Sequence, residues 1–199
     1  MNQYDVIIIG AGPSGIFCAY ELMRQKPDLK VLMIEKGRSI EKRQCPKRKT
    51  KTCVGCQPCS ITTRFAGAGA FSNGKLSLSP DVGGTLPEIL GYERATELIH
   101  EADDIYLKFG ADQKVYGIED YEAIENIRAK AIRANLKLIE CPIRHLGTEE
   151  GYKIYTRLQE HLESCGVEIR FMTMVKDIIV DDGAATGVVT DKGEEFYAP

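Results

Sequence analysis

The stretch that decides the fold is DVIIIGAGPSG, residues Asp5–Gly15. Its first part is a continuous apolar run, short enough for a β-strand that is buried on both faces. Its second part has the glycine order G-x-G-x-x-G, and the residues that follow, Ile16–Met23, are predicted to form a helix. A strand, a glycine turn and a helix in this order are typical of a dinucleotide-binding βαβ unit.

The three glycines of this stretch have different predicted roles. Gly10 permits a tight turn, Gly12 lets the backbone come close to a pyrophosphate, and Gly15 lets the helix pack closely on the strand. Pro13 suits the first turn of a helix, where its missing N–H costs nothing. The free N–H groups of that turn, including that of Ser14, form an anion site together with the helix dipole.

A second apolar run and an acidic residue complete the pattern. Val31–Ile34 is predicted to be a buried strand, and Glu35 follows it, twenty residues after Gly15. The dinucleotide fingerprint places an acid at about this distance, where its carboxylate accepts hydrogen bonds from a ribose diol and repels a 2′-phosphate. A plain βαβ unit with an incidental glycine turn is the alternative. The register of all these features favours a dinucleotide site.

Length and composition narrow the class of protein. The 199 residues are enough for one large domain or one and a half, and 43% of them are hydrophobic, as in a protein with a substantial core. The net charge of −3 implies no general attraction to nucleic acid or to a membrane, and no run approaches the length of a membrane span. The first strand leaves no room for a signal peptide, and an odd count of seven cysteines argues against a secreted disulfide framework. A cytoplasmic protein is expected.

The segment Lys36–Lys51 is strongly basic. It contains eight Lys or Arg and one Glu, which gives a local net charge of 8 − 1 = +7. A solvated loop is the simplest interpretation of such a run. A phosphate site, an acidic protein partner, and charge compensation for a metal–thiolate cluster are the functional alternatives.

Four cysteines follow with the spacing C-x7-C-x2-C-x2-C. Three thiols at successive x2 spacings can face one metal ion or one cluster, as in bacterial ferredoxins, where a Cys-Pro supplies a further ligand. Both Cys45-Pro46 and Cys141-Pro142 fit that last element, so the fourth ligand is ambiguous. A structural zinc site, a redox-active thiol pair and unliganded cysteines are the other interpretations. The candidate metal ligands are Cys45, Cys53, Cys56 and Cys59.

The segment Phe65–Leu76, FAGAGAFSNGKL, is rich in small residues. Small side chains let a backbone approach a planar ligand without collision, and Ser72, Asn73 and Lys75 then offer hydrogen-bond donors. A packing turn of small residues is the alternative.

Together, the glycine loop, Glu35, the cysteine run and Gly67–Leu76 resemble a family of uncharacterised FAD-dependent dehydrogenases within the glutathione-reductase-like flavoprotein superfamily. This chain has Asn73 where the family has Asp and Ala66 where it has Gly, which affects the donors expected around the flavin. The resemblance implies that the glycine loop binds the FAD pyrophosphate and that Glu35 binds the adenosine ribose. It also implies a small-molecule substrate and a redox partner, and it allows NAD(P)H as electron donor. The further FAD contacts that it implies are Lys36, Gly69, Ala70, Phe71, Ser72 and Val175, the last through its backbone to adenine.

The resemblance divides the chain into an FAD-binding domain, residues 1–80 and 146–199, and an inserted, mainly helical segment, residues 81–145, that faces the substrate. Helices are predicted at about 93–109 and 121–136, with a short strand at 138–139. Strands at 167–171 and 174–178 precede a hairpin at 181–183. Since the superfamily continues with elements that do not occur here, the chain is expected to be the N-terminal part of a longer protein.

Arg144-His145-Leu146-Gly147-Thr148 precedes another predicted helix, with Thr148 as its N-cap and Gly166 as its C-terminal stop. His145 is the candidate catalytic acid/base facing the flavin, and Arg144 is a candidate for holding a phosphate or carboxylate. A capping or surface histidine is the alternative.

The predicted fold class is α/β: a Rossmann-like FAD-binding βαβ domain with a parallel sheet, a β-hairpin element and a helical insertion. The predicted function is an FAD-dependent oxidoreductase in which the cysteines hold a metal or iron–sulfur relay. One alternative is flavin-dependent modification or binding of nucleic acid through the basic segment, although that segment has no aromatic residues for stacking. Another is a non-catalytic FAD-binding module with a structural zinc ion.

Overall fold

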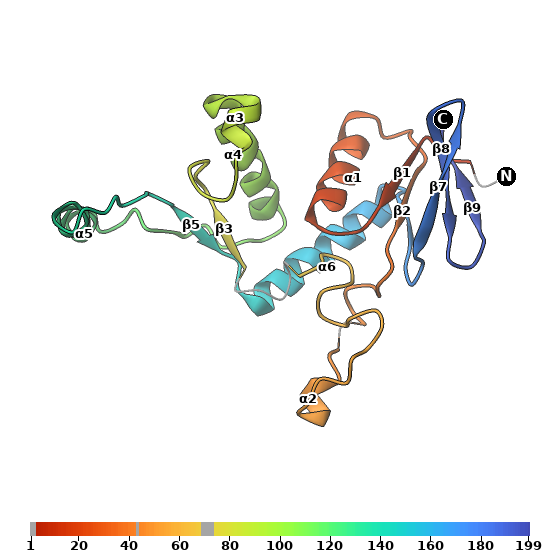
Figure 1. Ribbon diagram of the computed structural model, residues 1–199, viewed down its shortest axis with the longest axis horizontal. Coiled ribbons are helices and arrows are strands. Elements are labelled where there is room, and N and C mark those ends of the chain that lie inside the picture. Colours follow the sequence, from red (N-terminus) through yellow and green to blue (C-terminus); the bar gives the residue numbers. More distant parts are fainter. Residues whose placement is uncertain (1–2, 43, 69–73) are drawn as a thin grey trace. The chain divides into compact units, whose positions relative to one another are not determined.

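The computed structural model describes residues 3–42, 44–68 and 74–199. The chain divides into two compact units. Unit 1 comprises Met1–Phe71 and Tyr155–Pro199, and unit 2 comprises Ser72–Ile154. Unit 1 contains a parallel sheet and an antiparallel hairpin sheet, and unit 2 contains a small antiparallel sheet and the helices α3, α4 and α5 (Figure 1).

Unit 1 begins with the predicted βαβ arrangement. Strand β1 (Val6–Ile9) leads into helix α1 (Pro13–Gln25), and β2 (Val31–Ile34) lies parallel to β1. A third parallel strand, β6 (Glu168–Arg170), pairs with β2 and gives the order β1-β2-β6. All of β2 is buried, as expected for an apolar run at the centre of a parallel sheet. The predicted α/β class with a parallel sheet is confirmed.

Helix α1 packs on β1 and β2 through one apolar face. The buried residues Ile16, Ala19, Tyr20 and Met23 recur at the i, i+3, i+4 and i+7 spacing of a single helix face. Burying a side chain such as Ile16 stabilises the unit by about 1.5–3 kcal/mol. This packing holds the first turn of α1 at the end of β1.

Helix α6 (Thr148–Ser164) leads into β6, and the division between the two units falls inside it. It begins at Thr148, so the predicted cap residue is the first helical residue. Its buried side chains include Tyr155, Leu158 and Leu162. The predicted stop at Gly166 is confirmed, because Gly166 has a φ of +94°, which favours glycine.

The hairpin sheet of unit 1 follows β6. It contains β7 (Val175–Asp181), β8 (Ala184–Thr190) and β9 (Glu195–Tyr197), all antiparallel. The turn between β7 and β8 has positive φ at both Asp182 and Gly183, the two-residue geometry that matches strand twist. The predicted hairpin is therefore confirmed. Its core side chains pack with those of the parallel sheet in the cluster Leu32, Ile34, Val188 and Phe196.

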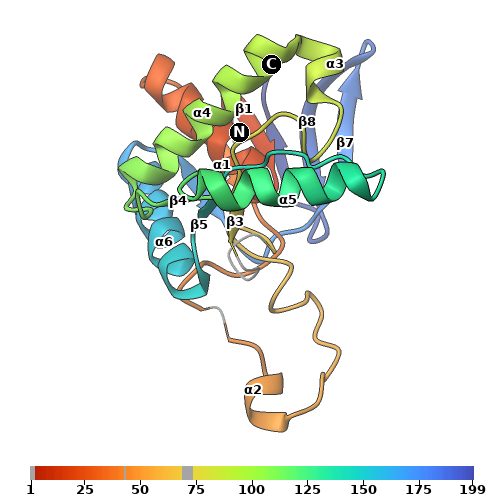
Figure 2. The same ribbon diagram turned by 90° about the vertical axis from the view of Figure 1, so that its left-hand side faces the viewer.

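The cysteine-containing loop of unit 1 lies between Arg38 and Arg64, and its two ends are next to each other. Arg38 and Arg64 form an isolated parallel β-bridge, and the chain between them is mainly irregular. The short helix α2 (Lys47–Thr50) lies within this loop. Figures 1 and 2 both show α2 extending away from the sheets of unit 1.

Unit 2 contains an antiparallel sheet in the order β3-β5-β4. A strand predicted at 138–139 is wrong, because that stretch is irregular and the strand lies at β5 instead. The predicted helices are present, although the second ends at Arg133 rather than at 136. The assignment of 81–145 as a substrate-facing insertion stays a prediction. The elements are β3 (Lys75–Ser77), α3 (Leu86–Leu90), α4 (Tyr92–Lys108), β4 (Val115–Tyr116), α5 (Tyr121–Arg133) and β5 (Ile143–His145).

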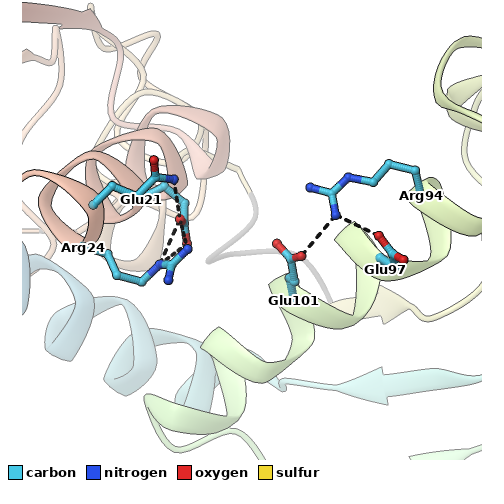
Figure 3. Close-up of polar contacts among 6 residues, drawn as sticks. Glu21, Arg24, Arg94, Glu97 and Glu101 are labelled. Carbon is cyan, nitrogen blue, oxygen red and sulfur yellow. Dashed lines mark hydrogen bonds and ion pairs between the residues drawn. The ribbon is translucent and has the colours of Figure 1, made fainter.

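Exposed ion pairs form within individual helices of both units. On α1, Arg24 Nη2 lies 2.8 Å from Glu21 Oε2, and on α4, Arg94 bonds Glu97 at 2.8 Å (Figure 3). Exposed pairs of this kind contribute only about 0.2–1 kcal/mol each, so they do not determine the fold. None of the helices in the described parts of the chain is both long and apolar enough to span a membrane.

Candidate functional site

The first glycine loop turns the chain from β1 into α1 with glycine-specific geometry. Gly10 has a φ of +98°, and its N–H donates to Ile34 O at 2.8 Å, which ties the turn to β2. Gly12 is the N-cap residue of α1, and Pro13 occupies the first helical turn, as predicted. The first N–H groups of a helix have no acceptor within the helix, so the N–H of Ser14 belongs to the expected anion site.

The other two glycines of the loop have opposite surroundings. A Cβ atom on Gly15 would lie 2.1 Å from Gly10 O, so only glycine allows this approach of helix to strand. A Cβ atom on Gly12 would meet nothing within 4 Å, and the backbone of Gly12 has ordinary angles of φ −76° and ψ 177°. The open space beside Gly12 therefore fits a ligand that approaches the backbone.

The carboxylate of Glu35 joins the loop to the end of β2. Its Oε2 accepts from Ala11 N at 2.9 Å and its Oε1 accepts from Gly37 N at 2.7 Å, and the residue is only 6% exposed. Each carboxylate oxygen has a second lone pair available for a ribose hydroxyl. Glu35 thus stabilises the loop in addition to its predicted ribose role, which stays a prediction.

The start of the small-residue segment lies against the glycine loop. Ala66 N donates to Ala11 O at 2.7 Å, and Phe65 and Ala66 are fully buried. Both Ala66 and Gly67 have positive φ, and a Cβ atom on Gly67 would approach Gly12 Cα to 3.9 Å. The segment therefore reaches the place where a dinucleotide is expected. The predicted contacts Gly69, Ala70, Phe71 and Ser72 lie outside the described residues.

A cavity of about 470 Å³ lies beside Lys36, the residue after Glu35. Met172, Met174 and Asp191 form part of its lining. Val175, the predicted adenine contact, begins β7 next to Met174 and packs partly buried against the core. The structure thus brings Lys36 and the neighbour of Val175 to one cavity, although they are far apart in sequence.

The four candidate metal ligands are all in the cysteine-containing loop. Cys45 and Cys56 are half-buried, whereas Cys53 and Cys59 are exposed. In the described parts of the chain, no three His, Cys, Asp or Glu side chains come together as a metal site would require. A cluster or zinc ion at these thiols stays a prediction that this geometry does not support.

Hydrogen bonds make the thiol of Cys59 more acidic than a free cysteine thiol. Hydrogen bonds from the Thr62 hydroxyl, and then from the backbone N–H groups of Thr62 and Ile61, lower the pKa of Cys59 to about 7. The same kind of contact, with Ser60, lowers the pKa of Cys56. Because the thiolate is the reactive form, Cys59 is suited to thiol chemistry near neutral pH.

We therefore expect alkylation of Cys59 by iodoacetamide to reach half its maximal rate near pH 7, well below the pH of about 8.5 typical of a free thiol. Thr62→Val should move this midpoint upward, because the thiolate loses its first hydrogen-bond donor. Mass spectrometry of the Cys59 peptide across pH measures both midpoints, and Ser60→Ala is the matched control. If Cys59 reacts only after a chelator is added, a metal holds it and the free-thiol interpretation is wrong.

His145 and Arg144 occupy β5 in unit 2. His145 is exposed, and its ring lies edge-on to Tyr116 with centroids 6.4 Å apart. Arg144 is buried and forms a two-pronged ion pair with Asp103, with Nε–Oδ1 at 2.5 Å and Nη2–Oδ2 at 2.7 Å. Its Nη1 also donates to Asp112 O at 2.6 Å. The prediction that Arg144 holds a ligand carboxylate or phosphate is wrong, whereas the catalytic role of His145 stays a prediction.

Two contributors to these sites were missed from the sequence. Arg64 is buried near the cysteines, and Asp103 neutralises Arg144 from α4. The position of Arg64, directly before the small-residue segment, was a usable signal. Asp103 gave no signal, because one acidic residue among several on an amphipathic helix is normally solvated.

Comparison with known proteins gives a family match at the N-terminal end of the chain. The model of the Thi4 family matches residues 1–41, which hold β1, the glycine loop, α1, β2 and Glu35. A thiamine thiazole synthase of Coprinopsis cinerea is 54% identical over 33 residues, which are 17% of this chain and 10% of that protein. The corresponding protein of Phaeosphaeria nodorum is 51% identical over 35 residues, 18% of this chain and 11% of that protein.

Solved structures are similar over almost the whole chain. The 3-ketosteroid-Δ4-(5α)-dehydrogenase of Rhodococcus jostii RHA1 has a TM-score of 0.56 at 19% identity, over 98% of this chain and 44% of that chain. An L-amino acid deaminase from Proteus vulgaris has a TM-score of 0.53 at 15% identity, over 100% of this chain and 46% of that chain. Glycine oxidase from Geobacillus kaustophilus has a TM-score of 0.52 at 16% identity, over 100% of this chain and 54% of that chain. The chain shares their fold and spans about half of each.

Proposed function

We propose that this chain is the FAD-binding part of an FAD-dependent oxidoreductase. The observation that carries the proposal is the geometry of the glycine loop. A Cβ atom on Gly12 would meet open space, Gly15 holds α1 tightly against β1, and the backbone of Gly67 approaches Gly12 from the small-residue segment. A pyrophosphate fits such a place, because helix N–H groups and small residues surround it without side chains in the way.

The other parts of the site fit the adenosine half of FAD. Glu35 has free lone pairs for the ribose hydroxyls, and the cavity beside Lys36 and Met174 offers about 470 Å³ for a base. When bound, FAD supplies the acceptance of a hydride or of electrons. The residues of this chain position the cofactor, and the acidic Glu35 favours a free ribose diol over a 2′-phosphate.

The comparisons support this function at a coarse level. The family match ends at residue 41, so it supports a nucleotide-binding unit and carries no thiazole synthesis to this chain. A dehydrogenase and an oxidase among the structural neighbours support redox chemistry. The finer placing, among uncharacterised dehydrogenases of the glutathione-reductase-like superfamily, rests on the sequence resemblance. A small-molecule substrate, NAD(P)H or another redox partner, and a cytoplasmic location belong to the same proposal.

Reconstitution tests the cofactor directly. The purified chain, unfolded and refolded or incubated with excess FAD, should retain a yellow flavin spectrum after gel filtration. FMN, which has no adenosine half, should be retained less well. Protein that stays colourless and shows no quenching of FAD fluorescence would contradict the proposal.

Replacing Glu35 should separate its two roles. In Glu35→Gln, the new amide group faces the N–H of Ala11 or of Gly37, so one buried donor loses its acceptor at a cost of about 1–3 kcal/mol in unfolding free energy. FAD affinity should also fall, and it should fall further in Glu35→Arg, which places a cation against the site. Denaturant titration and FAD titration of both variants measure these effects. Unchanged FAD affinity in Glu35→Arg would refute the ribose assignment.

A further inference from the structure

A second, smaller cavity of about 100 Å³ lies at the base of the cysteine-containing loop. Its polar lining includes the arginines Arg38 and Arg64 and the hydroxyls of Ser60 and Thr63. The thiol of Cys56 also lines it, and none of its lining residues carries a carboxylate. At about 30 Å³ for each water molecule, it has room for a group of a few heavy atoms. The cavity is therefore small, positively charged and rich in hydrogen-bond donors.

Backbone pairing brings the two arginines to this cavity. Arg38 and Arg64 form a β-bridge, and Phe65 N donates to Arg38 O at 3.2 Å. A Cβ atom on Gly37 would lie 2.0 Å from Thr63 O, so the two segments are in close backbone contact beside the cavity. The fold therefore sets the backbone positions of both arginines.

Arg64 lacks a carboxylate partner in the part of the chain that the structure describes. The residue is only 3% exposed, and its Nη1 donates a hydrogen bond to the backbone oxygen of Lys42. Burial, and after it the like charge of Arg38, lower the pKa of the Arg64 guanidinium. Negative charge on the thiols of the loop, that of Cys56 first, opposes that shift. Burying an arginine without a carboxylate partner is costly, so a bound anion would stabilise Arg64.

We propose that the cavity between Arg38 and Arg64 binds a phosphoryl group. Guanidinium groups present fixed forks of donors that match phosphate oxygens, and two of them can neutralise a dianion. The hydroxyls of Ser60 and Thr63 add donors from the same wall. The single negative charge of a carboxylate would leave one arginine unpaired.

The phosphoryl group has two possible sources, inorganic phosphate and a phosphorylated nucleotide. The small cavity shares Gln57, Pro58, Thr63 and Met172 with the 470 Å³ cavity, so the two are neighbours. A nucleotide in the larger cavity could place a second phosphate in the smaller one. The nucleotide source rests on the proposed function, whereas binding of phosphate alone does not.

Isothermal titration of the full chain at constant ionic strength tests the site, with sodium phosphate as the first probe. Arg38→Gln should weaken phosphate binding at least about tenfold, because an exposed but cavity-lining charge is lost. Lys47→Gln removes an equal charge from the exposed helix α2 and should leave the affinity unchanged. Arg64→Lys keeps the positive charge but loses the forked donors of the guanidinium group, so it should also weaken phosphate binding. The circular dichroism spectrum of this variant, which should match that of the wild type, shows that it is folded.

The second probe pair is adenosine 5′-phosphate and adenosine 5′-diphosphate, which both keep the free ribose diol. Tighter binding of the diphosphate, lost in Arg38→Gln, identifies a nucleotide as the source, whereas equal binding of both with retained phosphate binding identifies inorganic phosphate. FAD retention, measured on the same samples, reports separately on the proposed function. Equal weakening by Arg38→Gln and Lys47→Gln, or no phosphate binding by the wild-type chain, would overturn the proposal.

Discussion

Gly12→Val should abolish FAD binding while leaving the fold of the apoprotein intact. The backbone angles of Gly12 are accessible to any residue, and its Cβ direction is free of neighbours within 4 Å. The folded chain therefore tolerates a side chain there. A bound pyrophosphate does not, because valine would fill the space in which it approaches the helix N-terminus. We expect a loss of at least about a hundredfold in affinity, or about 2.7 kcal/mol.

Two measurements on the same variant separate binding from stability. FAD affinity is obtained by fluorescence quenching, and stability by thermal unfolding of cofactor-free protein. Gly12→Ala, with a smaller side chain, should lie between wild type and Gly12→Val in affinity and match both in melting temperature. If the cofactor-free melting temperature falls in step with affinity, Gly12 serves packing and the assigned role is wrong.

The N-terminal βαβ unit was predictable because the sequence features that determine it are close together in the chain. The apolar runs, the glycine spacing and the acid after β2 lie within thirty-five residues, and each fixes the geometry of its neighbours. Only part of the environment of Glu35 was predictable from the neighbouring sequence. Its place after the strand was predicted, but its bonds to Ala11 N and Gly37 N depend on how the turn closes over the sheet.

The sequence-based predictions were wrong where a residue or strand interacts with a partner that is distant in sequence. Arg144 was predicted as a candidate for holding a phosphate or carboxylate of a ligand. Its partner Asp103 is 41 residues away on α4, and only the folded unit brings the two together. The strand predicted at 138–139 failed for a related reason, since strand formation depends on a partner, and β3 pairs with β5 instead.

The cysteines show the limit of spacing as evidence. Their C-x2-C-x2-C pattern is compatible with a cluster, with zinc and with free thiols, and sequence alone does not rank these by geometry. The loop that carries them is anchored by Arg38 and Arg64, yet its thiols do not gather into a metal site among the described residues. One arginine of the basic segment Lys36–Lys51, Arg38, lines the small cavity.

Gly15→Ala should have the opposite effect to Gly12→Val, although both change a glycine of one loop. The new Cβ atom would lie 2.1 Å from Gly10 O and 3.2 Å from the side chain of Ile8. Gly10 O is a backbone atom at the end of β1, so it cannot rotate away as a flexible side chain would. Helix α1 must shift from the strand, and its buried face then loses contact with the sheet.

We expect Gly15→Ala to destabilise the cofactor-free chain by about 3 kcal/mol or more, the upper end of overpacking costs. Denaturant unfolding measures this loss. The matched control is Gly151→Ala within α6, where a Cβ atom meets nothing within 4 Å and alanine gains about 0.8–1 kcal/mol in helix propensity. If Gly15→Ala has wild-type stability, α1 does not pack on β1 as closely as in this structure. The close packing assigned to Gly15 would then be wrong, and it would not hold the glycine loop in place.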